Sequence, residues 1–367
     1  MSRPKKLIFS SETPSPERLR AVTAAFRRVT EVHAADGYAP IYQQMAAGVA
    51  DDPELLAIAA SAGPGQNPPI LLFAAAQFLL ADHPDDPLVR FYPVLSGAPA
   101  PEADPYPALR DFVLAHRAAV TEIVATRLVQ TNEPGRSSLV YPALLAAQCL
   151  GGGRPLALIE VGASAGLTLV PDRYAYDYGT GVRSGDPASP LVLNCTLRGE
   201  LAPPLAGPLS VAWRTGIDLN PLSLDDAADC RWLRALVWPD HPGRAERLDL
   251  AARAAARGRL PVIHRGNAAA QLPDLLAQAP AGTTVVVYHT AVLSHFTDQD
   301  RTEFVRTLPE LSAQRPFTWI QGESGPDRVP RLRAALLDDG QIQDERMLGQ
   351  YHPHGAWLEW LDADLAG

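Results

Sequence analysis

Lysine is almost absent from this sequence. Of its 32 Lys and Arg residues, only Lys5 and Lys6 are lysines, and both lie close to the N-terminus. A pyridoxal Schiff base, a P-loop and a protein-kinase fold each need a lysine inside the site. The near absence of lysine therefore excludes these three classes of protein.

Cysteine is also scarce, since the 367 residues contain only Cys149, Cys195 and Cys230. None of them forms a Cys-x-x-Cys pair, so the sequence predicts no iron–sulfur cluster, no zinc ribbon and no metal site. His352 and His354 have metal-ligand spacing, but no third ligand accompanies them. Cysteine usage of this kind indicates a reduced, cytoplasmic protein.

Positive charge and long apolar runs are lacking as well. The chain has 32 Lys and Arg against 41 Asp and Glu, which gives a formal charge of −9. This acidic balance disfavours non-specific binding to nucleic acid, which depends on neutralising phosphates. No stretch of about 18 apolar residues is present, and residues 1–10 lack the apolar core of a signal peptide. We therefore expect neither a nucleic acid nor a membrane as a partner.

Prolines recur between the segments of the first 150 residues, and within these segments apolar residues follow one another at helical spacing. Ser15-Pro16 and Asp52-Pro53 each place a capping residue before a proline, a common way to begin a helix. Further helices are predicted over residues 70–80, 107–127 and 136–150. We expect residues 1–150 to form a helical domain that acts as a lid or binds the substrate.

After residue 150 the pattern changes to short apolar runs that alternate with helical segments, the last of them a helix predicted over 327–337. Alternation of this kind predicts an α/β fold with a mostly parallel sheet. We expect a Rossmann-like domain over residues 151–367, of the class I methyltransferase type. An insertion at about 171–208 interrupts it, and residues 347–361 predict an antiparallel C-terminal edge.

The sharpest local motif follows the first predicted strand. Glu160, Gly162, Ala163, Ser164 and Gly166 resemble the E-x-G-x-G-x-G turn of Rossmann-like methyltransferases, with Ser164 in place of the middle glycine. Glycines let the backbone pass close to a bound nucleoside, and the N-terminus of the expected next helix faces it. We predict that these five residues bind a cofactor.

Two other interpretations of this turn stay open. Gly162-x-Ser164-x-Gly166 is also the pattern of a nucleophile elbow, which would make Ser164 the nucleophile of an α/β-hydrolase. Asp298 with His352 or His354 would then complete the triad. Alternatively, the glycines only tighten a connection between a strand and a helix.

The ends of the following strands favour the nucleoside interpretation. Asp218 ends the second strand, where a carboxylate accepts hydrogen bonds from ribose hydroxyls. Asn267 follows the third strand, where an amide can contact the adenine edge. A hydrolase gives no reason for either residue, so we predict that both bind S-adenosylmethionine.

Six segments carry a resemblance to a known family. They are 64–69 (PGQNPP), 130–136 (QTNEPGR), 160–166 (EVGASAG), 172–179 (DRYAYDYG), 216–221 (GIDLNP) and 231–239 (RWLRALVWP). With them the chain resembles the bacterial family called domain of unknown function 2332 over nearly its whole length. The resemblance implies no activity, so the functional prediction depends on the strand ends.

A polar segment before the helix predicted at 136–150 supplies the candidate acceptor site. Asn132 and Arg136 are predicted to bind the substrate, and Glu133 to act in catalysis, as an amide, a guanidinium and a carboxylate within one turn. His289, near the end of the fourth strand, is the candidate general base. The alternatives are a capped helix start with a surface ion pair, and a half-buried structural histidine.

These observations predict an S-adenosylmethionine-dependent methyltransferase. The Asn-Pro-Pro-Tyr motif of enzymes that methylate amino groups of nucleic acids is absent from the fourth strand. We therefore expect a small-molecule substrate with a hydroxyl or carboxyl acceptor. The alternative from another class is a non-catalytic nucleoside-binding protein of the same fold.

Overall fold

The computed structural model describes residues 14–34, 39–130, 132–325 and 327–365, so Lys5, Lys6 and the segment 1–10 lie outside the described part. The chain divides into two compact units, one of Met1–Gln130 with Arg231–Ala245 and one of Thr131–Cys230 with Glu246–Gly367. The boundary predicted at residue 150 therefore differs from the one observed at Gln130. The reason is helix α8 (Ser137–Leu150), which is buried on every side over residues 137–147 and packs against the sheet.

The first unit is helical. Its helices and its 3-10 turn η1 are α1 (Pro16–Ala34), α2 (Pro40–Ala50), α3 (Pro53–Ala59), α4 (Pro68–Leu80), η1 (Pro87–Phe91), α5 (Pro93–Ser96), α6 (Tyr106–Ala115) and α7 (Arg117–Thr126). The helix starts predicted at Pro16 and Pro53 are confirmed, and the side chain of Asp52 accepts hydrogen bonds from two amides of α3. The single helix predicted over 107–127 is two helices, because the backbone leaves the helical conformation at His116.

The segment Arg231–Ala245 returns to the first unit and contains the end of α9 (Ala227–Ala235) and the start of α10 (Pro242–Ala255). Trp232 Nε1 donates to the carbonyl oxygen of Leu128 at 3.0 Å. Asp240 accepts from the amide of Ile41 at 2.9 Å and so caps α2. The family-like segment 231–239 thus contributes to the packing of this unit.

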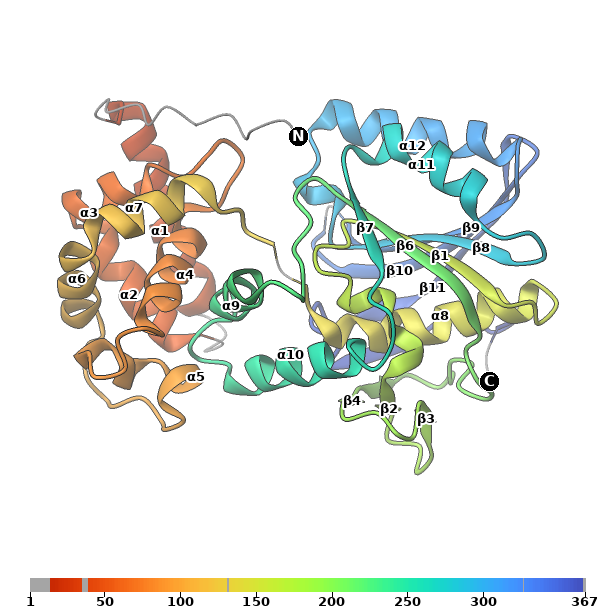
Figure 1. Ribbon diagram of the computed structural model, residues 1–367, viewed down its shortest axis with the longest axis horizontal. Coiled ribbons are helices and arrows are strands. Elements are labelled where there is room, and N and C mark those ends of the chain that lie inside the picture. The colour runs from red at the N-terminus through yellow and green to blue at the C-terminus, as the bar shows by residue number, and fades with distance from the viewer. Residues whose placement is uncertain (1–13, 35–38, 131, 326, 366–367) are drawn as a thin grey trace. The chain divides into compact units, whose positions relative to one another are not determined.

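The second unit contains a nine-stranded sheet in the order β5-β12-β11-β10-β9-β8-β1-β6-β7 (Figure 1). The strands are β1 (Leu156–Val161), β5 (Thr196–Arg198), β6 (Val211–Asp218), β7 (Val262–Arg265), β8 (Thr284–Thr290), β9 (Phe317–Ser324), β10 (Pro330–Asp338), β11 (Gln341–Tyr351) and β12 (Trp357–Trp360). Strands β7, β6, β1, β8 and β9 are parallel, and β10 to β12 form an antiparallel edge. The predicted α/β fold with this C-terminal edge is confirmed. The order of the parallel strands reverses on either side of β1, where ligands bind in open α/β sheets.

Strand β10 corrects the helix predicted over 327–337. Leu332, Ala335 and Leu337 are buried, whereas Leu336 is 44% exposed. Although Ala, Leu and Arg favour helices, pairing with β9 on one side and β11 on the other fixes the strand. Tertiary pairing here outweighs local helix propensity.

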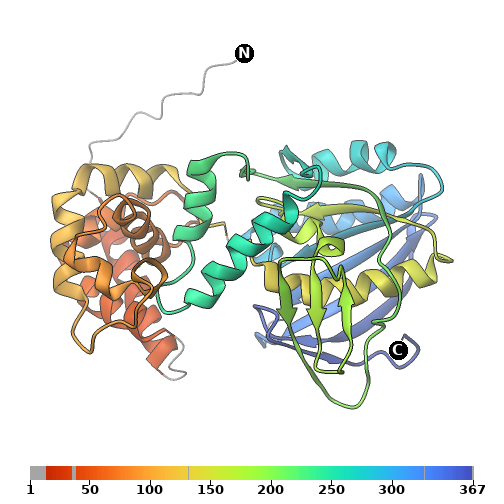
Figure 2. The ribbon, with the colours of Figure 1, turned by 60° about the horizontal axis from the view of Figure 1, so that its bottom comes forward.

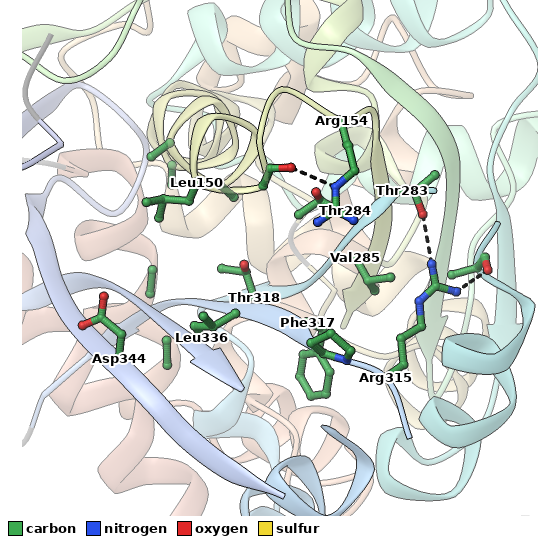
Figure 3. A pocket seen from close by; sticks show the side chains of 18 of the residues that line it. Leu150, Arg154, Thr283, Thr284, Val285, Arg315, Phe317, Thr318, Leu336 and Asp344 are labelled. Atoms are coloured by element: carbon green, nitrogen blue, oxygen red, sulfur yellow. Dashed lines mark hydrogen bonds between the residues drawn. The ribbon is translucent and has the colours of Figure 1, made fainter. Parts of the chain in front are cut away.

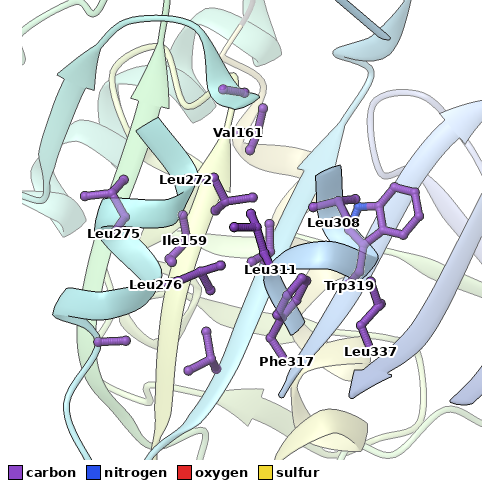
Figure 4. Packing of buried hydrophobic residues seen from close by; sticks show 14 of the residues in the cluster. Ile159, Val161, Leu272, Leu275, Leu276, Leu308, Leu311, Phe317, Trp319 and Leu337 are labelled. Carbon is purple, nitrogen blue, oxygen red and sulfur yellow. The ribbon is translucent and has the colours of Figure 1, made fainter. Parts of the chain in front are cut away.

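Helices cover both faces of the sheet. α11 (Ala268–Gln278) and α12 (Asp298–Ser312) lie on one face and α8 on the other (Figure 1). On the first face, Ile159 and Val161 of β1 share a buried cluster with leucines of both helices (Figure 4). Because side chains alternate along a strand, Glu160 points to the α8 face.

The helix expected after the Gly162–Gly166 turn does not form. The chain instead makes two 3-10 turns, η3 (Leu167–Leu169) and η4 (Pro171–Arg173). The insertion then folds into a small sheet of β2 (Ala175–Asp177), β3 (Arg183–Gly185) and β4 (Val192–Asn194), whose strands lie side by side in Figure 2. Tyr174, Tyr176 and Tyr178 are buried here, and each hydroxyl donates to a backbone carbonyl. The tyrosines therefore act in packing.

Candidate functional site

The turn after β1 has an unusual backbone. Gly162, Ser164 and Gly166 have φ angles of 74°, 52° and 76°. A Cβ atom at Gly162 would lie 2.4 Å from Cγ2 of Val292, so packing as well as backbone conformation requires a glycine there. Val292 therefore fills the space beside Gly162. Ser164 is not a glycine and yet has a left-handed backbone conformation, which is a strained feature of the kind that clusters at functional sites.

Glu160, near the end of β1, is a buried carboxyl group. Glu160 is only 2% exposed, and its Oε1 accepts a hydrogen bond from the hydroxyl of Thr168. Burial raises the pKa of Glu160 to about 8, and the nearby carboxylate of Asp218 adds to the increase. Within the described residues, Oε2 has no hydrogen-bond partner, and neither has the buried Oγ of Ser164. A buried polar atom without a partner costs free energy, so these two atoms mark the turn as a candidate binding site.

Asp218 joins the end of β6 to this turn. Oδ2 accepts from the amide of Ser164 at 2.8 Å, and Oδ1 accepts from the amide of Asn220 at 2.8 Å. Ala163 is buried against Gly216 of the same strand, where a Cβ would lie 2.5 Å from the Ala163 Cβ. The structure thus brings together Glu160, Ala163, Ser164 and Asp218, whose binding of a cofactor stays a prediction.

Asn267 has a structural task at the start of α11. Its Oδ1 accepts from the amides of Ala269 and Ala270, and its Nδ2 donates to Asp300 at 3.2 Å. It lies after the edge strand β7, two strands from β1. Its predicted contact with adenine stays a prediction.

The segment after Thr131, which itself lies outside the described residues, belongs to the sheet unit and not to the helical one. Asn132 Oδ1 accepts from the amide of Leu167 at 2.9 Å, just past the turn after β1. Arg136 Nη1 donates to the carbonyl of Thr290 at 3.0 Å, at the end of β8. Asn132 and Arg136 therefore lie at the carboxyl ends of the central strands.

Glu133 is directed elsewhere. It is 3% exposed, accepts from the amide of Gly135 at 3.0 Å, and lies 3.6 Å from both Arg247 and His354. Glu133 thus caps the turn that precedes α8, as in the alternative of a capped helix start. The ion pair, however, joins Glu133 to Arg247 and buries Glu133, whereas that alternative had Arg136 in a surface pair.

His289 lies on the opposite face from Glu160. It is fully buried, and its ring contacts Phe304 of α12 and Trp319 of β9. Its Nδ1 lies 2.7 Å from Oε1 of Glu323, whereas Nε2 has no partner in the described part of the chain. From the four candidate residues of the acceptor site one would expect Glu133 and Arg136 to face this histidine, but they do not, because the alternation along β8 turns its ring towards α12.

Glu323, at the end of β9, is the polar residue that the sequence analysis missed. Besides His289 it accepts from the amides of Val292 and Leu293, at 2.8 and 3.3 Å. Burial raises its pKa, but the hydrogen bond with His289 and the two amides bring the pKa below its usual value. The sequence signal for Glu323 is an acidic residue at the end of a fifth parallel strand, the same signal that Asp218 gives at the end of β6.

No group of three or more His, Cys, Asp or Glu residues is placed to hold a metal ion in the described part of the chain. Among the described helices, none is long and apolar enough to cross a membrane.

The family model for an uncharacterised protein conserved in bacteria, domain of unknown function 2332, matches residues 23–360. The chain belongs to this family. The match covers both units, so the predicted resemblance is confirmed. No curated protein and no solved structure matches the chain. The family description names no activity, and a function has to be argued from the site.

Proposed function

We propose that this member of the family binds S-adenosylmethionine at the turn after β1 and transfers its methyl group to a small molecule. The observation that carries the proposal is the pair Glu160 and Asp218 at the ends of neighbouring strands, together with Glu160 Oε2 and Ser164 Oγ, which have no partner among the described residues. The reversal of strand order at β1 supports the same location.

The residues at the turn suit a cationic nucleoside. S-adenosylmethionine carries a sulfonium and an ammonium group, and its ribose offers two hydroxyl donors. The carboxylate of Asp218 lies at the end of β6, where it holds the amide of Ser164, and Oε2 of Glu160 lacks a donor among the described residues. The side chain of Val292 lies against Gly162 and leaves no room for the cofactor to approach the backbone there. The fit therefore depends on Glu160, Ser164 and Asp218.

When bound, the cofactor supplies a methyl group that its sulfonium already activates, so the protein has mainly to align donor and acceptor. At the end of β8 the carbonyls of Thr290 and Pro353 hold the guanidinium of Arg136, whose planar shape suits a carboxylate. A carboxylate acceptor needs no general base, which agrees with the separation of Glu133 and His289 from the turn. Of the two acceptor classes predicted, we therefore favour the carboxyl group over the hydroxyl group.

The charge on Glu160 gives a direct test. With a pKa of about 8, its carboxyl group is mostly protonated at pH 7. A bound cation stabilises the ionised form, so S-adenosylmethionine should displace a proton. Calorimetry at pH 7 in two buffers of different ionisation enthalpy measures that release. S-adenosylhomocysteine, which lacks the sulfonium charge, should displace fewer protons.

The matched variants are Glu160→Gln and Asp274→Asn. The first should abolish proton release, because no carboxyl group remains to ionise. The second changes an exposed acid on α11 and should leave both affinity and release unchanged. Absence of binding heat for both nucleosides contradicts the proposal, while binding without methylation of any carboxylic acid tested supports the non-catalytic alternative.

A specific observation keeps the hydrolase alternative testable. Ser164 has the left-handed φ of a nucleophile elbow, although a 3-10 turn and not an α-helix follows it, and its Oγ is not engaged by other described residues. For the same reason no described histidine hydrogen-bonds to this hydroxyl, as a catalytic base would. The methyltransferase proposal therefore predicts an unreactive Ser164.

A further inference from the structure

A second feature of the sheet unit lies at the opposite ends of the parallel strands. A pocket of about 830 Å³ opens where β8 and β9 begin, between α8 and the hairpin of β10 and β11 (Figure 3). Its volume is within the range of about 300–1,000 Å³ that is usual for small-molecule sites. It has no part in the site at the turn after β1.

Small side chains keep this pocket open. Ala143 and Ala147 line it from α8, and Thr284, Thr318 and Ala334 line it from the strands. A helix packed closely on a sheet usually fills such positions with large aliphatic residues, because interiors are close-packed. Here small residues face small residues, and space remains between them.

Large apolar side chains surround the pocket and stay exposed. Leu150 at the end of α8 is 61% exposed, and Leu336 of β10 is 44% exposed. An exposed apolar patch beside a pocket is typical of a binding site. An aliphatic ligand would bury both leucines.

Positive charge gathers on one side of the pocket. Figure 3 shows Arg154 and Arg315 on one side, and Leu150, Leu336 and Asp344 on the other. Arg154 donates through Nε to the carbonyl of Gly151 at 2.8 Å, and its two terminal nitrogens have no partner within the described ranges.

The other charges lining the pocket are accounted for differently. Arg315 donates through Nη1 to the carbonyl of Ala279 and through Nη2 to the carbonyl of Pro280 at 2.7 Å and to Thr283 Oγ1 at 3.2 Å, and no described carboxylate pairs with it. Asp344 is paired with Arg346 at 2.6 Å. The uncompensated charge of the pocket is therefore positive, and it sits opposite the exposed leucines.

We propose that this pocket binds an aliphatic carboxylate, with Arg154 and Arg315 on the carboxylate and the chain between α8 and the β10–β11 hairpin. Arginine presents parallel donors that match the two oxygens of a carboxylate. The apolar lining and the two leucines take the alkyl chain. This proposal does not depend on the one made for the turn after β1.

Calorimetry with sodium octanoate, decanoate and dodecanoate, each below its micelle concentration, tests the alkyl part. Affinity should rise about fourfold for each added methylene until the pocket is full, the effect of burying a CH₂ group. Dodecyltrimethylammonium, which has the same chain with a cationic head, should bind at least tenfold more weakly than dodecanoate. Equal affinity for the three carboxylates, or for the two head groups, overturns the proposal.

Variants test the residues. Arg154→Gln removes an exposed side chain whose terminal nitrogens have no described partner, and it should weaken dodecanoate at least tenfold. Arg306→Gln on α12, 63% exposed, is the matched control and should change nothing. Ala147→Phe fills the pocket and should abolish binding while the circular dichroism spectrum is retained. Undiminished binding by Arg154→Gln refutes the proposal. So does a dimer of the native chain that Ala147→Phe dissociates, since a second copy would then occupy the pocket.

Discussion

At the carboxyl ends of β1 and β6 the chain buries Glu160 close to Asp218, whereas at the amino ends of β8 and β9 it surrounds a pocket with alanine, threonine and arginine. The first end buries Glu160 Oε2 and Ser164 Oγ, which have no partner among the described residues. The second keeps apolar surface exposed around open space. Each arrangement lowers the stability of the protein when no ligand is bound. A cationic ligand at the first end of the sheet and an anionic ligand at the second would therefore be stabilising.

The largest expected effect is on the pH dependence of the free energy of unfolding, and it comes from Glu160 at the carboxyl ends of β1 and β6, the acidic end of the sheet. The pKa of Glu160 is raised in the folded state, so the folded protein holds a proton that the unfolded chain loses near pH 4.5. Stability should therefore fall as the pH rises from about 4.5 to 8, by about 1.4 kcal/mol per pH unit. Glu160→Gln should remove this slope in urea unfolding measured from pH 5 to 9.

The comparison variant for this measurement is Glu303→Gln, an exposed glutamate on α12. It should keep the slope of the native chain. Asp218, Tyr174, Tyr288 and Arg136 also face or influence Glu160, and they stay unchanged in both variants. If Glu160→Gln retains the full slope, Glu160 is not the group that titrates.

The second effect compares two glycines before and after the same strand. Gly162→Ala meets Val292 at 2.4 Å in addition to a positive φ, and we expect a loss of about 2–4 kcal/mol in the free energy of unfolding. Gly152, just before β1, has a φ of 72° and nothing within 4 Å, so Gly152→Ala should lose only about 1 kcal/mol. Equal losses would show that the Val292 contact relaxes freely.

The third effect is on binding. Asp218→Ala should weaken S-adenosylmethionine by about 1.5–3 kcal/mol, the scale of hydrogen bonds to a charged group. Dodecanoate binding at the other end should not change, which separates loss of the ribose contact from general unfolding. Calorimetry with both ligands on the same preparation gives the result, and an unaltered nucleoside affinity counts against the ribose assignment.

The sequence predicted most of this fold because its signals were local. Proline after a capping residue started α1 and α3, and short apolar runs placed the parallel strands. The prediction was wrong where contacts between distant segments decide the structure. β10 has a composition that favours a helix but pairs with β9, and α8 follows the helical unit in sequence but belongs to the sheet unit.

The candidate site was predictable only in part, for the same reason. Residues at strand ends, such as Glu160 and Asp218, come together because parallel strands end at one edge. The direction of a side chain at that edge depends on which face its position takes. His289 illustrates this, since one step along β8 decides whether its ring meets Glu323 or the turn.

The smallest expected effect is the change in stability on removing the hydroxyl of Ser164. The same residue distinguishes methyl transfer from hydrolysis by a serine nucleophile. Its Oγ is buried without a described partner, so removing it in Ser164→Ala deletes an unsatisfied group and should change stability by less than about 0.5 kcal/mol. A serine nucleophile would need a histidine at hydrogen-bond distance, and the histidine of β8 is held by Glu323 instead. A fluorophosphonate probe should therefore leave the native chain unlabelled in intact-mass spectra. Labelling that Ser164→Ala abolishes would replace the methyltransferase proposal with a hydrolase, because only an activated hydroxyl reacts with such a probe.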